Sequence, residues 1–171
     1  RQTLQRYAGK VTLGAIYEDI QSNQGTVNQL TQPLSQFLTQ PFSVGSINFP
    51  LEPDGRIHKL GSEYRKLLEQ TYNKKLLDEM TALSVETRSF AEAVLTGSGI
   101  NYAKPKGDRI HFWGPSGTFK QIPFWYVLDP INWNGYLQRG NFFKDKIVLI
   151  GPTADELKDF HKAPFSQSWL Y

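Results

Sequence analysis

Residues 146–151 have the sequence Lys-Ile-Val-Leu-Ile-Gly, and this stretch decides the fold class. The four apolar residues from Ile147 to Ile150 are typical of a short strand that is buried on both faces, as in a parallel sheet. The Gly-Pro pair that follows breaks the strand. Thr153 and Glu156 then have the spacing of a capping box, which predicts a helix directly afterwards. A strand followed by a helix in this way indicates an α/β fold.

Upstream of this stretch, the pattern predicts one further strand and three helices. Residues 109–113 are typical of a strand, and residues 123–128 of one or two helical turns that Pro130 ends. Ser89 and Glu92 form another capping box, so a helix is expected from there to Gly97. Apolar residues at helical spacing predict a helix between Ser62 and Met80.

The first third of the chain predicts strands and a turn. Residues 10–17 are typical of a short buried strand, and apolar residues at helical spacing from Leu30 to Leu38 predict a short amphipathic helix. Residues 43–50 and 56–60 flank Pro53-Asp54-Gly55, a strong turn signal, and so predict an antiparallel hairpin. We therefore expect a single α/β domain over residues 1–171, with a mostly parallel central sheet, an antiparallel hairpin and helices packed on the sheet.

Composition excludes several classes of protein. The chain has 171 residues, 39% of them hydrophobic, and a formal net charge of only +3, with basic residues scattered rather than clustered. This distribution argues against nucleic acid as a partner. Without cysteine there are no disulfides, thiolate metal sites or thiol nucleophiles. No apolar run approaches the roughly 18 residues of a membrane helix. Because the chain begins at Arg1 and stops at Tyr171, we expect it to be a piece of a longer protein.

Four residues are candidates for ligand binding. Asp155, Asp159 and His161 are ligand types suited to a divalent cation, and the two aspartates lie four residues apart, on one face of a helix. The alternative is a solvated helix end with a histidine in the next loop. Trp133 lies between two asparagines, so we expect its ring to be exposed and available to a ligand. The other aromatic residues are more typical of a core.

No catalytic constellation can be identified. A glycine turn at Ile150–Thr153 resembles a phosphate cradle, but Pro152 removes a donor and the carboxylates that follow would repel a phosphate. The G-x-S-x-G motif of hydrolases is absent, as are the glycine-rich nucleotide motifs. From the residues alone we predict no catalytic residues, no metal site and no cofactor.

The stretch from Arg109 to Ser166 resembles the C-terminal half of a CHASE2 domain. The resemblance rests on Trp113-Gly114-Pro115, Gly117-Thr118-Phe119, Lys146 to Gly151 and Ala163-Pro164-Phe165-Ser166, together with the Pro53-Asp54-Gly55 turn. The sequence from Phe124 to Pro130 is particularly similar to that of cyanobacterial members. By comparison with the family, we expect further elements of the domain before Arg1 and after Tyr171.

The resemblance implies an extracytoplasmic sensory domain of a membrane-anchored signalling receptor. It implies that this domain is not itself an enzyme and that the parent protein carries an output domain. The expected output is a class III adenylate or guanylate cyclase in cyclic nucleotide signalling, with a histidine or serine/threonine kinase as the alternative. The signal, whether small molecule, ion or protein, is unknown. A homodimerising module without ligand and a soluble α/β enzyme remain open.

Overall fold

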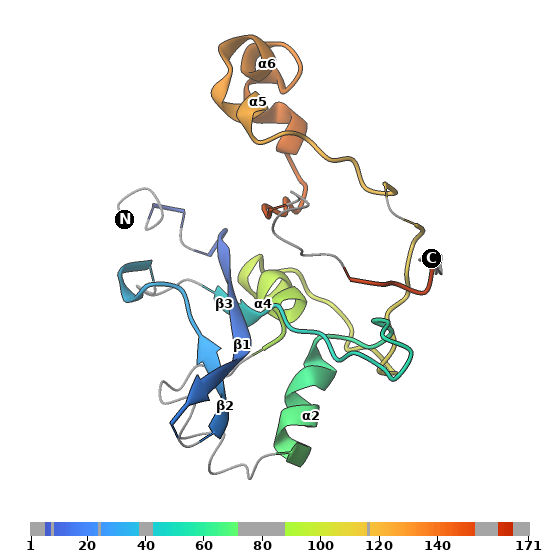
Figure 1. Cartoon of the computed structure of the whole chain (residues 1–171). Helices are drawn as coiled ribbons and strands as arrows, with labels where there is room; N and C mark the ends of the chain where they lie inside the picture. The colour runs from blue at the N-terminus through green and yellow to red at the C-terminus, as the bar shows by residue number, and fades with distance from the viewer. Residues whose placement is uncertain are drawn as a thin grey trace, which may run out of the picture. The chain divides into compact units, whose positions relative to one another are not determined.

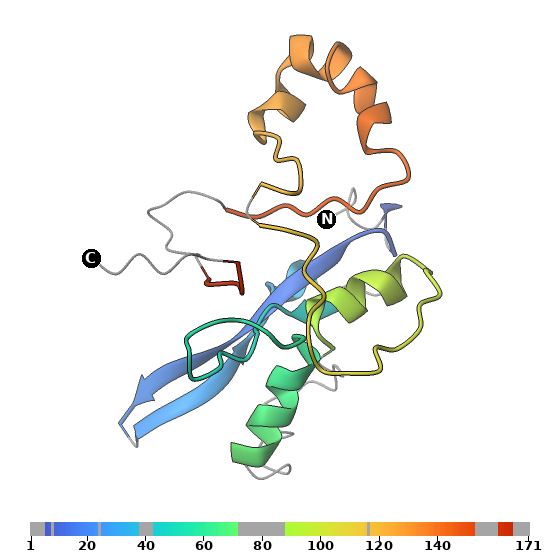
Figure 2. The ribbon, with the colours of Figure 1, turned by 90° about the vertical axis from the view of Figure 1, so that its right-hand side faces the viewer.

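The computed structural model describes residues 6–7, 9–23, 25–37, 43–71, 88–115, 117–152 and 161–165. The chain divides into two compact units, Arg1–Ile110 and His111–Tyr171. Figures 1 and 2 show the course of the chain through both units. Each unit is described by itself. The prediction of one domain over residues 1–171 stays a prediction.

The first unit contains a three-stranded mixed sheet (Figure 1). Its strands are β1 (Thr12–Ser22), β2 (Gly25–Thr31) and β3 (Ser43–Ser46), in the order β2-β1-β3. β1 pairs with β2 antiparallel, and with β3 parallel. The strand predicted at residues 10–17 is confirmed, as is an α/β arrangement. A mostly parallel sheet is not confirmed, because the described strands make one pairing of each kind.

The side chain of Asn48 continues the pairing of β1 beyond the end of β3. Its Oδ1 accepts a hydrogen bond from the Tyr17 backbone N–H at 2.7 Å, and its Nδ2 donates to the Tyr17 carbonyl at 3.0 Å. The Ser46 hydroxyl donates to the same Oδ1 at 3.0 Å. One amide side chain thus hydrogen-bonds to both backbone groups of Tyr17 beyond the end of β3.

Two helices pack on this sheet, α2 (Ser62–Thr71) and α4 (Phe90–Gly97). Leu68 of α2 joins Ala15, Tyr17 and Leu30 in the core. α4 packs on β3 and β1. The close approach of α4 requires Gly45, because a Cβ there would lie 2.6 Å from Phe90 Cα, well inside contact distance.

Local signals placed both helices correctly. The capping box at the start of α4 is present: the Ser89 side chain accepts from the Glu92 N–H, and the Glu92 carboxylate accepts from the Ser89 N–H at 3.1 Å. After the helix, Gly99 adopts φ +70, which suits glycine. The helix predicted between Ser62 and Met80 is confirmed for Ser62–Thr71, and its remainder lies outside the described residues.

The helix predicted from Leu30 to Leu38 is wrong. Leu30 lies in β2 and is buried in the core, Leu34 is exposed, and the described residues that follow it, up to Phe37, form only the short 3-10 helix η1 (Ser35–Phe37). The helical spacing of these apolar residues was incidental. Pairing of β2 with β1 buries Leu30, and tertiary pairing of this kind overrides local periodicity.

The turn at Pro53-Asp54-Gly55 is confirmed, but the predicted hairpin is much shorter than expected. Gly55 has φ +70, and its N–H donates to the Glu52 carbonyl at 2.8 Å. A single antiparallel bridge joins Leu51 to Ile57. Residues 43–46 pair with β1 instead, and Lys59 forms an isolated antiparallel bridge with Arg109.

The second unit is built from short helices in its described part: α5 (Trp125–Leu128), α6 (Pro130–Asn134) and η2 (Gln138–Phe143). The helical turns predicted at residues 123–128 are confirmed. α6 was not predicted, although Pro130 is its first residue and the Asp129 carboxylate caps it by accepting from the Asn132 N–H at 2.8 Å. Leu137 is fully buried among these turns.

The strands predicted at residues 109–113 and 147–150 are not formed in the described structure. Within residues 109–113, the only strand-like pairing is the single β-bridge between Arg109 and Lys59. Leu149 and Ile150 are 74% and 78% exposed. A strand needs a neighbour for its N–H and C=O groups, and no described segment pairs with residues 147–150. The prediction of a doubly buried strand is therefore wrong for the described structure.

Candidate functional site

A groove in the first unit is the strongest candidate for a ligand-binding site. It has a volume of about 630 Å³, within the range typical of small-molecule sites. Its walls come from α2, from α4 together with its cap and the residue before the cap, and from the segment that follows α4; Figure 2 shows the course of these parts of the chain. Lining residues are Ser62, Arg65, Lys66, Glu69, Arg88, Ser89, Glu92, Thr96, Tyr102 and Lys104.

The walls of the groove are polar and carry more positive than negative charge. Four of the lining residues are basic and two are acidic, which leaves a surplus of two positive charges. Ser62, Thr96 and Tyr102 add hydroxyl groups. Tyr102 is the one aromatic ring in the lining, so a bound molecule would meet one flat apolar face among donors.

Both carboxylates of the groove already have partners. Glu69 Oε1 accepts from Arg65 Nε at 2.9 Å, an i,i+4 pair on α2. Glu92 Oε2 accepts from the Ser89 hydroxyl at 2.6 Å and belongs to the α4 capping box. The capping box therefore occupies the N-terminus of α4, and each carboxylate already accepts hydrogen bonds from within the groove.

The basic residues differ in how far they are neutralised. Lys66 Nζ lies 2.7 Å from Glu63 Oε1, and the pKa of Lys66 is raised first by this hydrogen bond and then by the charge of Glu63. Arg65 is paired with Glu69. For Lys104, by contrast, no carboxylate among the described residues lies within ion-pair distance. Lys104 is exposed and reaches the groove from the segment after α4.

A second polar cluster surrounds the Pro53-Asp54-Gly55 turn. His58 Nε2 donates to Asp54 Oδ2 at 3.0 Å and lies 3.9 Å from Glu52 Oε2. The hydrogen bond from His58 is the largest cause of the lowered pKa of Asp54. These three side chains are close enough to share a metal ion.

Cations already occupy much of this cluster. Lys59 and Arg109 lie 3.7 and 3.8 Å from Glu52 Oε1, and Arg56 lies 3.9 Å from Asp54 Oδ2. A divalent ion would have to compete with three positive charges. We therefore interpret the cluster as an ion-pair network that holds the turn and its neighbouring strand segments together.

Of the four ligand-binding residues predicted from sequence, only His161 and Trp133 lie among the described residues. Asp155 and Asp159 lie outside the described residues, while His161 is described and exposed. Trp133 lies in α6 and is half-buried rather than exposed. Its ring packs close to Gly140, where an added Cβ would lie 3.1 Å from it. Whether any of these four residues binds a ligand stays a prediction.

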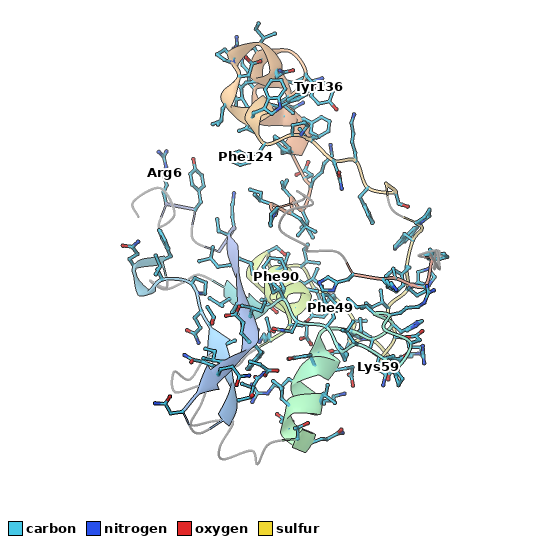
Figure 3. The ribbon with its side chains drawn as sticks, viewed as in Figure 1. Arg6, Phe49, Lys59, Phe90, Phe124 and Tyr136 are labelled. Atoms are coloured by element: carbon cyan, nitrogen blue, oxygen red, sulfur yellow. The ribbon has the colours of Figure 1, made fainter. Side chains whose placement is uncertain are left out.

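An aromatic cluster in the second unit is also rich in cations. Tyr136, labelled in Figure 3, stacks on Phe142 with ring centroids 5.5 Å apart. Lys120 Nζ lies 4.9 Å from the Tyr136 ring centre, and Lys146 Nζ lies 4.2 Å from that of Phe142. These cation–π contacts tie residues 120 and 146 to the helical turns. The rings already hold the chain's own cations, so this cluster is structural.

Sequence reasoning did not find the groove. Its residues come from Ser62 to Lys104 and share no local motif. The one available signal was the unequal charge of the segment from Arg88 to Lys106. That signal is weak, because basic residues are common on solvated surfaces.

Comparison with known families identifies the chain. The family model of the CHASE2 domain matches residues 2–171 and so spans both units. CHASE2 domains are extracytoplasmic sensory domains of signalling receptors and are not catalytic. The chain belongs to the CHASE2 family.

Two further comparisons gave nothing: no curated protein and no solved structure matches the chain. Within the described residues, no helix has the length and apolar character needed to cross a membrane.

Proposed function

We propose that this CHASE2 domain is the signal-input domain of a membrane-anchored class III nucleotide cyclase of cyanobacterial type. In this proposal the domain lies on the periplasmic side of the plasma membrane. The match to the CHASE2 family over residues 2–171 carries the sensory part of the proposal. The cyclase output rests on the resemblance of Phe124 to Pro130 to cyanobacterial members. A histidine or serine/threonine kinase is the alternative output. Family membership favours a sensor over the soluble α/β enzyme that the sequence left open.

The domain would signal by a shift between two conformations. A ligand can move such an equilibrium only by binding one conformation more tightly than the other. The groove offers a place for this, because its walls belong to separate segments and α4 packs directly on β3 and β1. A change in the spacing of α2 and α4 would therefore reach the sheet.

The proposal is tested in the full-length receptor. A periplasm-active reporter, such as alkaline phosphatase, fused at the domain should be active, and a cytoplasm-active reporter should be silent. Deleting residues 2–171 should leave the output activity but remove its response to growth conditions. A reporter active only in the cytoplasm, or an unchanged response after deletion, would contradict the sensory role.

The nature of the output is tested separately by assaying the purified full-length receptor. Formation of cyclic AMP or cyclic GMP from the nucleoside triphosphate supports the cyclase. Transfer of phosphate to protein, without a cyclic product, would replace the cyclase by a kinase while leaving the sensory role intact.

A further inference from the structure

We propose that the groove between α2 and α4 binds a small organic anion, with a carboxylate or phosphate group directed at Lys104, and that the signal read by the domain belongs to this chemical class. The second half of this statement rests on the proposed sensory function. The first half concerns binding alone and stands on the geometry of the groove.

The positive net charge of the groove favours a negatively charged ligand. Among the lining residues, the two carboxylates are held by Arg65 and by the α4 cap, and Lys66 is held by Glu63 outside the lining. With Glu63 counted, the groove keeps a surplus of one positive charge, which solvent, salt or a ligand must balance. Lys104 has no carboxylate partner among the described residues. The carboxylate of Glu69 is already ion-paired with Arg65, and that of Glu92 is hydrogen-bonded in the α4 cap, which disfavours a cationic ligand.

The size and lining of the groove select an organic molecule over a simple ion. A volume of about 630 Å³ far exceeds that of one phosphate group. The hydroxyls of Ser62 and Thr96 can hydrogen-bond to polar substituents, and the Tyr102 ring can cover a carbon skeleton. A hydroxylated or multiply charged acid of a few carbons matches these features, whereas an apolar ligand would leave the charged groups without partners.

The position of Lys104 would let an anion join separate parts of the unit. Lys104 follows α4, whereas Ser62 and Arg65 belong to α2. An anion held from both sides would favour the conformation in which α2 and the segment after α4 lie closest together. Differential affinity of this kind is what a sensory domain requires.

The test is calorimetric titration of the 171-residue chain at low ionic strength with three probes: citrate, glucose 6-phosphate and glucose. Binding of citrate alone supports a carboxylate signal, and binding of glucose 6-phosphate alone supports a phosphate. Binding of both supports recognition by charge, and each should weaken in high salt because the groove is open to solvent. Lack of heat from both anions up to about 10 mM, or equal binding of neutral glucose, would overturn the proposal.

A pair of matched variants assigns the binding to the groove. Lys104→Gln should weaken binding of the anion at least about fivefold, because one charge-assisted hydrogen bond is lost. Lys106→Gln removes the same charge two residues away, at an exposed position outside the lining, and should bind like the parent chain. Both residues are exposed, so both variants should fold. Equal affinity of the two variants would overturn the assignment.

Because binding is measured on the chain without an output domain, its result is independent of the sensory proposal. If the anion binds but Lys104→Gln leaves the response of the full-length receptor unchanged, the groove is a binding site and the claim about the signal is overturned. If the anion does not bind, the groove assignment fails while the deletion and reporter results still decide the sensory role.

Discussion

The two units of the chain differ in how far several of their apolar residues are exposed. In the first unit, Leu30 and Leu68 are less than 10% exposed and pack with Tyr17. In the second, Trp113 and Ile131 are each 82% exposed. The difference lies in partners: strands far apart in sequence pair in the first unit, whereas the described helices of the second contact mainly their neighbours along the chain. Apolar composition alone does not bury a residue, since burial requires a second surface.

The largest expected effect compares one leucine from each unit. Leu68→Ala removes a side chain that is 5% exposed, and should lower the free energy of unfolding by about 2 to 5 kcal/mol. Leu149→Ala removes one that is 74% exposed, and should change it by less than about 0.5 kcal/mol. Chemical denaturation followed by circular dichroism measures both. A loss at Leu149 as large as that at Leu68 would show that the second unit buries this segment after all.

A glycine pair tests the packing of the first unit. Gly45→Ala places a Cβ 2.6 Å from Phe90 Cα and 2.8 Å from Ala93 Cβ, so α4 must move away from β3. We expect a loss of about 1 to 3 kcal/mol in the free energy of unfolding. Gly107→Ala is the control, since nothing lies within 4 Å of its added Cβ. If the two variants had equal stability, the close contact between α4 and β3 would be wrong.

The smallest expected effect is on the pKa of Asp54, in the turn at Pro53-Asp54-Gly55. Its carboxyl has a pKa below the ordinary value of 3.8, with the hydrogen bond from His58 as the largest cause. Because the folded pKa is lowered, the stabilisation is present above pH of about 3.9 and is lost as the pH falls through the folded pKa. An NMR pH titration of the Asp54 carboxyl carbon in His58→Gln should show the pKa returning toward its ordinary value. His111→Gln, in the second unit, should leave it unchanged; equal pKa values in both variants would remove His58 as the cause.

Local signals in the sequence predicted local structure. The turn at Gly55 and the capping box of Ser89 and Glu92 were both correct, since each depends on residues within a few positions. Leu30 was misassigned because its burial depends on the pairing of β2 with β1. The bridge that Asn48 makes to Tyr17, 31 positions away, has no local signature at all.

The strand predicted at residues 147–150 and the groove both depend on segments that are far apart in the sequence, which local patterns do not predict. Four apolar residues in a row predict a strand only if a partner strand is present, and none of the described segments provides one. The groove combines Arg65 with Lys104, which only the folded chain brings together. Family resemblance, by contrast, depends on the whole pattern of residues and not on one contact, so it identified the CHASE2 domain correctly.

The central claim is that this chain is the input domain of a membrane-anchored receptor, and the most direct measurement is the reading frame on either side of it. We predict membrane-spanning segments and, beyond Tyr171, a cyclase or kinase domain. A stop codon shortly after Tyr171, together with no membrane-spanning segment on either side, would contradict the claim.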